Sequence, residues 1–425
     1  MKKGLIALLS IVLLISAMFS LMASAHNPNE SGLNTQFMTE EELVIYERSL
    51  RQYDAVIYYD EMISTFFDEY GEKSGQPACY PERYAGAYIN DEGKLVIQIA
   101  IDLESELLTF DDLYNEYAMY VDLEAIKETD EVFEAGNIND LVVFEQVEYS
   151  LNDLNLILER AVSEIGERYP TIGYYVDTLN NTVAIEFTSA VYEEAIVDEK
   201  APLVFCVSET YETTASHIGG QGYYTVGGYN YSLGFTGYYL VNSNNQNQLS
   251  YLTCGHNSSY SVGDNIVYNG NVVGTVGLKQ WSNNGTGDWA VVYLNSSQTI
   301  SGLIKKDSSG TTGKIKARVQ TVPVNTIVYR FGNATQSWQS LEVTVVNCTE
   351  SISDSPTNTT YTIKSLVKCK RITGTNAQGG DSGGPIVIVN GSNYSAVGVL
   401  SAQLGDAHLY NPMTNVPGNF SVAIG

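Results

Sequence analysis

Gly379-Gly380-Asp381-Ser382-Gly383-Gly384-Pro385 is the stretch of this 425-residue chain that says most about its fold and chemistry. Glycines let the backbone turn sharply, so that the hydroxyl of Ser382 can project from the turn. The same turn can direct the backbone N–H groups of Gly380 and Ser382 toward one point, where an oxyanion would form. A glycine-rich turn by itself is common, but the full run predicts a serine nucleophile.

A serine nucleophile needs a base, and the base needs a group that orients it. Of the four histidines, His256 follows an apolar, strand-like run, and Asp288 precedes another such run. Either residue alone would more often be structural. Together they give the chain order His256, Asp288, Ser382, which excludes the α/β-hydrolase and subtilisin orders of this triad.

Further short motifs surround these three residues in a fixed order: Ser232–Phe235, Leu252–His256, Gly287-Asp288, Arg330–Thr335, Ala377–Gly384 and Val397–Ser401. In these motifs the chain from about His217 to its C-terminus resembles the chymotrypsin-like serine proteases of the bacterial α-lytic protease and streptogrisin branch. The resemblance implies an all-β protease domain of two packed antiparallel β-barrels, with the triad between them. It also implies a serine endopeptidase that acts on protein or peptide substrates through an acyl-enzyme, with no cofactor and no nucleic-acid partner. We expect no metal site, because no cluster of cysteines and histidines has ligand spacing.

The residue pattern after His217 agrees with an all-β domain. Short β-branched runs alternate with turn residues, and Asn269-Gly270 between two apolar runs is a strong hairpin signal. No long helical period appears in this part. The pattern alone leaves both a barrel and a sandwich open.

Charge divides the chain near residue 216. Before it, 41 acidic residues outnumber 11 lysines and arginines, whereas after it 11 basic residues slightly outnumber 8 acidic ones. Such asymmetry suggests parts with separate roles. We therefore expect an acidic α+β region over 26–215 and the protease domain over 216–425.

The acidic region has its own structural signals. Residues 40–70 are helical in composition, and Ser150–Asp153 resembles a capping box ahead of an apolar stripe. Residues 87–97 and 174–185 each have the pattern of a strand, a turn and a second strand, which indicates a weak internal repeat. These hairpins resemble the pro-region of the α-lytic branch, which implies a folding aid and inhibitor that is removed on maturation. An unrelated acidic domain remains the alternative.

Residues 1–25 have the layout of a secretory signal, with Lys2 and Lys3 before an apolar run and then Ala23-Ser24-Ala25. This predicts a secreted protein. The apolar run is also long enough for an uncleaved membrane anchor, which would leave the protein at the cell surface. A catalytically inactive secreted homologue that acts as a binding protein is the other alternative.

The chain has five cysteines, and a secreted protein permits disulfides. Cys348 and Cys369 each end an apolar run, so adjacent strands could bring them within bridging range; we expect this pair. Two bridges usual in the family are missing here, at Tyr231 with Asn257 and at Asn376. Cys254 is then expected to be a buried free thiol, and Cys79 and Cys206 are unassigned.

The resemblance also assigns residues around the triad. Ser401 is expected beside Asp288, at the start of a strand that pairs with substrate. Ala402 and Gln403 follow where glycines are usual, and Gln403 is expected to narrow the primary specificity pocket. In animal members Asp381 pairs with a new N-terminal amine, but here Arg330 stands where the bacterial branch supplies an arginine. The alternative for Arg330 is a solvated surface residue.

Overall fold

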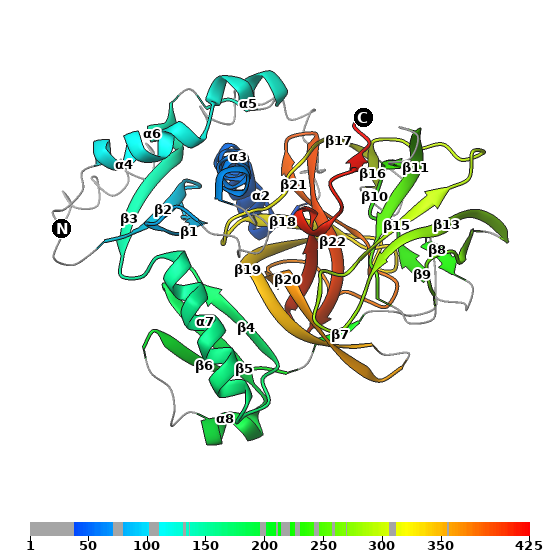
Figure 1. The fold of residues 1–425 in the computed structure, drawn as a ribbon. Coiled ribbons are helices and arrows are strands. Elements are labelled where there is room, and N and C mark those ends of the chain that lie inside the picture. Colours follow the sequence, from blue (N-terminus) through cyan, green and yellow to red (C-terminus); the bar gives the residue numbers. More distant parts are fainter. Residues whose placement is uncertain are drawn as a thin grey trace, which may run out of the picture.

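In the computed structural model, the described residues are 38–70, 80–101, 110–130, 133–135, 137–195, 201–209, 211–213, 222–225, 230–241, 246–256, 260–268, 270–305, 312–354 and 357–425. Figure 1 shows a β-rich body in the centre and on the right, and an α/β region on the left. The expected signal segment, residues 1–25, lies outside the described residues. Within the described part, no helix is both long and apolar enough to cross a membrane.

A closed barrel forms the centre of the molecule (Figure 1). Its six strands pair in a ring, β18 to β19 to β20 to β23 to β22 to β21 and back to β18. Their interior-facing side chains are largely apolar and buried. The strands are β18 (Ile327–Phe331), β19 (Trp338–Asp354), β20 (Thr359–Arg371), β21 (Pro385–Asn390), β22 (Asn393–Leu404) and β23 (Ala407–Pro412).

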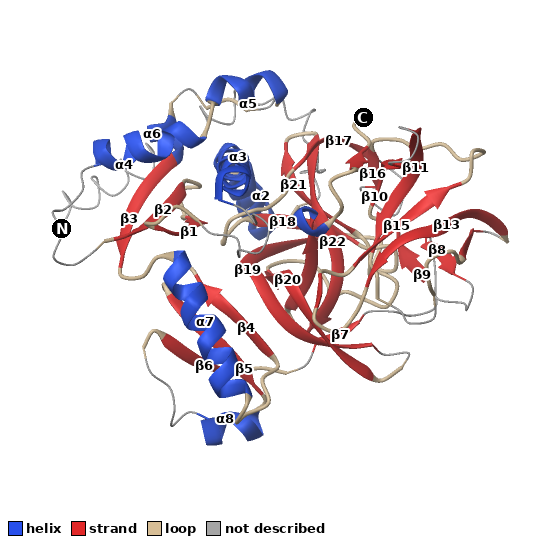
Figure 2. Ribbon diagram, in the orientation of Figure 1, coloured by secondary structure: helices blue, strands red, loops and turns tan. Residues whose placement is uncertain are grey.

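A second, eight-stranded sheet lies on the right of the molecule (Figure 2). Its order is β24-β10-β11-β15-β13-β12-β8-β9, with neighbours antiparallel. The strands are β8 (Gly222–Thr225), β9 (Asn230–Ser232), β10 (Phe235–Val241), β11 (Gln246–Thr253), β12 (Asn265–Tyr268), β13 (Asn271–Gln280), β15 (Trp289–Leu294) and β24 (Phe420–Val422). Short strands β14 (Gly285–Thr286), β16 (Leu303–Lys305) and β17 (Thr312–Arg318) join the larger sheet.

The N-terminal region consists of two similar α/β units. In each, a hairpin is followed by a third strand parallel to the hairpin's second strand. The expected repeat is therefore present, although only its hairpins were visible in the sequence. The first unit holds α2 (Glu40–Arg51), α3 (Tyr53–Tyr70), β1 (Tyr84–Ile89), β2 (Leu95–Ala100), α4 (Phe110–Tyr117), α5 (Leu123–Thr129), α6 (Ile138–Leu141) and β3 (Val142–Val147); the second holds α7 (Leu151–Gly166), β4 (Gly173–Asp177), β5 (Thr182–Phe187), α8 (Ser189–Ala195) and β6 (Leu203–Val207).

The helices begin where the side chains can cap them. Ser150 and Asp153 form the expected capping box of α7, and Thr39 and Glu42 form a second one at α2. The helical stretch 40–70 is divided at Gln52, whose buried side chain hydrogen-bonds both the N–H and the carbonyl of Ile327 in the barrel. These two hydrogen bonds attach the junction of α2 and α3 to β18.

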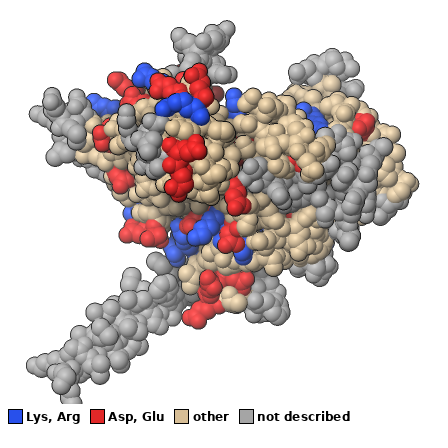
Figure 3. All heavy atoms as spheres, turned by 90° about the horizontal axis from the view of Figure 1, so that it is seen from below, with Lys and Arg blue, Asp and Glu red and all other residues tan. Residues whose placement is uncertain are grey.

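The N-terminal region packs on the barrel through sheet and side-chain contacts. The β4–β5–β6 sheet continues the barrel's own sheet, because β4 pairs antiparallel with β19. On α3, the carboxylate of Asp60 accepts hydrogen bonds from the N–H groups of Gln320 and Thr321. In the view of Figure 3, acidic side chains are spread over the left and central parts, which hold the N-terminal region, and are sparse on the right.

The expected Cys348–Cys369 disulfide is wrong for this structure, in which both cysteines are free and buried. Bulges shift the β19–β20 ladder so that Cys348 pairs with Leu366, whereas Cys369 pairs with Val343. The two thiols also pack into different apolar clusters. Cys254 is free as well, and Cys79 lies outside the described residues.

Candidate active site

The three expected triad residues come from two different sheets. His256 follows β11 and Asp288 immediately precedes β15; these strands are neighbours, with Thr253 opposite Ala290. Ser382 belongs to the turn before β21 of the barrel. The side chains of all three are fully buried in this structure.

The carboxylate of Asp288 holds the ring of His256 in place. Oδ2 of Asp288 lies 2.6 Å from His256 Nδ1 and accepts the Ser401 hydroxyl at 2.5 Å, while Oδ1 accepts the N–H groups of Gly255 and His256 at 2.6 Å each. These contacts fix Nδ1 as the protonated nitrogen and leave Nε2 without a hydrogen-bond partner among the described residues.

The pKa values of this pair are shifted in opposite directions. Burial alone would raise the pKa of Asp288, but His256 and the hydrogen bonds hold it below its ordinary value. Burial alone would lower the pKa of His256, but the Asp288 carboxylate holds it well above its ordinary value. The pair is therefore built to stabilise an imidazolium next to a carboxylate.

The turn that carries Ser382 is pinned by its own backbone. Asp381 N–H donates to Gln378 O, Gly383 N–H to Leu400 O and Gly384 N–H to Asp381 O, at 2.8–2.9 Å. Gly380 and Gly383 have φ values of 98° and 80°, which favour glycine. A Cβ on Gly383 would also lie 2.0 Å from Thr253 Oγ1, so this glycine is required by space as well.

Arg330 lies in the barrel with its guanidinium against the acid next to the nucleophile. Its Nη1 is 3.0 Å from Asp381 Oδ2, and both side chains are fully buried. Asp381 also accepts N–H groups of Ala334, Thr335 and Gln378 at 2.8–3.0 Å. Burial lowers the pKa of Arg330 although Asp381 opposes this effect. The structure thus brings together the two residues that the sequence paired, and Arg330 is not on the surface.

The strand expected to bind substrate already carries a partner. Besides its contact with Asp288, Ser401 has its carbonyl 3.5 Å from Ser382 Oγ. Strand β7 (Tyr211–Thr213) pairs antiparallel with β22, with Thr213 opposite Ala402 and Glu212 opposite Gln403. The chain segment between the N-terminal region and the eight-stranded sheet therefore adds a strand where an extended peptide would add one.

Ser232 supports the nucleophile turn and was not picked out as a site residue from the sequence. Its N–H donates to Ser382 O at 2.9 Å, and its hydroxyl donates to Gly380 O at 2.7 Å. Asn411 likewise accepts the N–H of Asp288 at 3.1 Å. Ser232 belongs to the Ser232–Phe235 motif, whereas no local sequence pattern marks Asn411.

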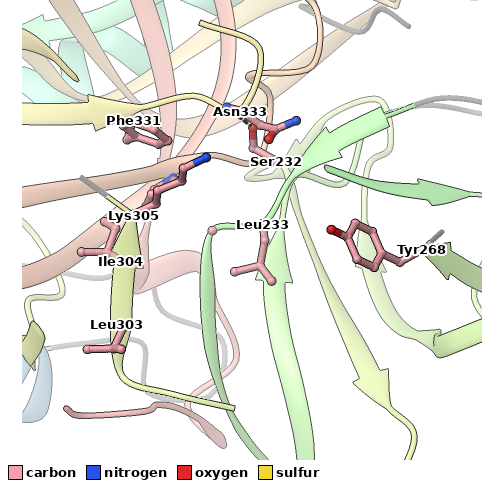
Figure 4. Close-up of a pocket in the computed structure, with 10 residues that line it drawn as sticks. Ser232, Leu233, Tyr268, Leu303, Ile304, Lys305, Phe331 and Asn333 are labelled. Carbon is pink, nitrogen blue, oxygen red and sulfur yellow. Dashed lines mark hydrogen bonds between the residues drawn. The ribbon is translucent and has the colours of Figure 1, made fainter. Parts of the chain in front are cut away.

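A cavity of about 300 Å³ is lined by Ser232 together with residues of the eight-stranded sheet and of the barrel. Figure 4 shows Leu233 and Tyr268 on one side of it and Phe331 and Lys305 on the other. Lys305 Nζ donates to Gln336 Oε1 at 2.8 Å, so its charge is directed at a neutral partner.

Two family models match this chain. Residues 241–420 match the model described as Trypsin, and residues 45–147 match the model described as Pro-like N-terminal domain. Residues 241–420 therefore form a domain of the trypsin family of serine proteases, and a pro-like domain precedes it.

Several solved bacterial proteases are similar to the chain. Thermobifida fusca protease A is 25% identical with a TM-score of 0.37, and the match covers 49% of this chain and 98% of that one. A Nocardiopsis protease is 23% identical with the same TM-score, covering 49% and 97%. An α-lytic protease homologue named N4 is 19% identical with a TM-score of 0.34, covering 46% and 92%. A search of curated proteins finds no match.

Proposed function

We propose that the chain is a secreted serine endopeptidase made as a pro-form, with His256, Asp288 and Ser382 as its catalytic triad. The observation that carries the proposal is the contact between Asp288 Oδ2 and His256 Nδ1, at 2.6 Å and fully buried. This contact orients the His256 ring, whose Nε2 has no hydrogen-bond partner among the described residues, in a site that also contains the hydrogen-bonded turn of Ser382. The eight-stranded sheet is, in this proposal, the second barrel of the trypsin fold.

Each residue has a defined role in the proposed reaction. Ser382 Oγ attacks the substrate carbonyl as His256 Nε2 takes its proton, and His256 then gives that proton to the leaving amine. Asp288 keeps the ring in the required tautomer and stabilises the imidazolium. The N–H groups of Gly380 and Ser382 bind the oxyanion; those of Asp381, Gly383 and Gly384 already donate to the protein's own carbonyls. A water molecule then cleaves the acyl-enzyme by the same steps in reverse.

The proposed precursor has three parts. Residues 1–25 are a signal peptide, 26–215 a pro-region, and 216–425 the protease domain. The pro-like match, the sheet shared by β4 and β19, and the pairing of β7 with β22 support a pro-region that covers the substrate strand. Substrates are proteins or peptides that add to β22 in the same way as β7.

The test is expression of the full chain and of Ser382→Ala, followed by activity measurement and N-terminal sequencing of the secreted product. We expect Ser382→Ala to lower turnover by about 10⁴–10⁶-fold and to block processing near residue 215. Near-normal activity of that variant would exclude the serine mechanism. Secretion of a processed but wholly inactive wild type would favour a binding protein, and retention in the membrane fraction an anchored form.

A further inference from the structure

Two consecutive residues of β9 connect the nucleophile turn to the interior of the eight-stranded sheet. Successive side chains of a strand point to opposite faces. On one face, the Ser232 hydroxyl donates to the carbonyl of Gly380 at 2.7 Å. On the other, Tyr231 is buried in an apolar cluster of the eight-stranded sheet that also contains Tyr260. Strand β9 therefore joins that cluster to the turn that carries Ser382.

Tyr260 holds the backbone just before His256. Its hydroxyl donates to the carbonyl of Cys254 at 2.7 Å, and both residues are buried. The pairing of β11 with β15 ends at Thr253, so this carbonyl lies beyond the last paired residue of the strand. Burial raises the pKa of Tyr260 well above its ordinary value, so the hydroxyl stays protonated and can donate. The hydrogen bond thus fixes the chain where the β-ladder no longer does.

The ring of Tyr231 lies against both Tyr260 and His256. The ring centroids of Tyr231 and Tyr260 are 5.8 Å apart with an interplanar angle of 74°. Those of Tyr231 and His256 are 6.3 Å apart with an angle of 71°. Edge-to-face pairs of this kind are favourable and fix the rings relative to each other. Tyr260 is also held from β13, because Lys279 Nζ lies 4.0 Å from its ring centroid and donates to its carbonyl at 2.6 Å.

We propose that Tyr231 and Tyr260 form an aromatic brace whose two members are positioning residues for His256. The brace joins the segment that ends at His256 to the strand that supports the turn of Ser382. This inference rests on the proposed protease function and adds two residues to its machinery. Tyr231 stands at one of the positions where a cysteine usual in the family is missing, so the brace makes a connection that a disulfide would otherwise make. A displacement of about 1 Å in such a site can lower the rate by about 100-fold.

Loss of the brace should weaken the contact between Asp288 and His256. The carboxylate of Asp288 accepts the N–H groups of Gly255 and His256 and also contacts Nδ1 of the ring, so a shift of this backbone disturbs all three contacts. Burial alone would lower the pKa of His256, and the Asp288 carboxylate is what holds it well above its ordinary value. A weaker contact therefore lowers that pKa. Because the neutral ring is the active form, the low-pH limb of activity then moves to lower pH.

The experiment compares the secreted wild type with Tyr260→Phe, which removes the hydroxyl and keeps the ring, on one peptide p-nitroanilide across the pH range. We expect kcat to fall by about 10-fold with KM nearly unchanged. The low-pH limb of kcat/KM should move to lower pH by about half a pH unit or more, and the low-field proton signal of His256 Nδ1 should shift or broaden. Tyr293→Phe is the matched control, because Tyr293 lies in the same sheet with its ring against Tyr239 and outside the brace. It should leave all these readouts unchanged.

A second pair of variants tests the ring of Tyr231. Tyr231→Phe keeps the ring and should retain the wild-type pH limb and proton signal, whereas Tyr231→Leu should change both as Tyr260→Phe does. Urea unfolding of the same variants in a Ser382→Ala background measures their packing separately. A loss of stability in Tyr260→Phe and Tyr231→Leu without any change in kcat, pH limb or signal would overturn the inference. Labelling of Ser382 by a fluorophosphonate tests the other level, since a wild type that neither labels nor cleaves any peptide contradicts the proposed function itself.

Discussion

At the scale of single residues, the buried pair of Arg330 and Asp381 sets the position of the nucleophile turn. Asp381 is adjacent to Ser382. Its carboxylate forms an ion pair with Arg330 and accepts hydrogen bonds from three backbone N–H groups. The pairing links β18 to the turn before β21, so the barrel itself holds the acid. The site described here therefore needs no free N-terminal amine at Asp381.

Replacing Arg330 should accordingly damage both stability and activity. Arg330→Ala leaves the buried Asp381 carboxylate without its countercharge, and breaking such a pair costs roughly 3–5 kcal/mol. Unfolding by urea in a Ser382→Ala background would measure this loss without self-digestion, and turnover would be measured in the active background. Lys314→Ala removes an exposed cation of β17 and should change the unfolding free energy by less than about 0.5 kcal/mol. Equal effects of the two variants would contradict this account.

Short-range patterns made much of the site predictable. The glycines at 380 and 383, the order of His256, Asp288 and Ser382, and the position of Arg330 are all visible locally. The disulfide was wrong because the bulges that set the β19–β20 register have no simple sequence signal. Asn411 was missed because its contact with Asp288 depends on packing between two distant segments.

At the scale of elements, three neighbouring strands bring two carboxylates together where the N-terminal region meets the barrel. Glu186 on β5 and Glu350 on β19 both pair with Gly173 on β4, which lies between them. A Cβ on Gly173 would lie 2.5 Å from Glu350 Oε2 and 2.8 Å from Glu186 Oε2. Lys368 Nζ reaches Glu186 at 2.6 Å and Glu350 at 3.2 Å and also lies over the Tyr175 ring. The single ammonium group of Lys368 therefore forms ion pairs with two buried carboxyl groups.

This cluster should make the assembled chain less stable at alkaline pH. Burial, and to a smaller extent Glu186, raise the pKa of Glu350 to about 8, although Lys368 opposes the shift. In the unfolded chain the pKa of a glutamate is about 4.3. The folded state thus holds a proton that the unfolded state has lost, and stability falls as pH rises from about 4.3 to about 8.

The measurement is the unfolding free energy of the full-length Ser382→Ala chain between pH 5 and pH 9. In the same background Glu350→Gln mimics the protonated side chain and should be less sensitive to pH, by about 1 kcal/mol or more across this range. Glu342→Gln is the control. Glu342 also lies on β19, and it forms an ion pair with Arg48 of α2, so it too joins the barrel to the N-terminal region. Parallel pH profiles for the parent and Glu350→Gln would show that Glu350 does not carry this proton.

At the scale of the whole molecule, the N-terminal region and the barrel share one sheet and one apolar core. Strand β4 extends the sheet from β19, and the largest buried cluster joins residues of α3 and β1 to residues of β20 and β22. The sequence could indicate each half through its charge and its hairpins. The pairing of β4 with β19 could not be predicted from the sequence, because contacts between residues so distant in the chain leave no local pattern.

This arrangement underlies the last prediction, that residues 216–425 fold poorly alone and are rescued by residues 26–215 added in trans. The barrel closes through pairings between strands far apart in sequence, and such contacts form slowly because loop closure costs entropy before they stabilise anything. A preformed β4–β5–β6 sheet offers β19 an edge on which to order, which lowers that cost. Refolding yield would be followed by titration of Ser382 with a fluorophosphonate, and an excess of residues 26–215 should inhibit the refolded enzyme. Gly173→Val in the added part should weaken rescue, because its side chain would displace the buried carboxylates of Glu350 and Glu186, whereas Leu179→Ala at the exposed β4–β5 turn should not. Efficient refolding of 216–425 without the added part would refute this role.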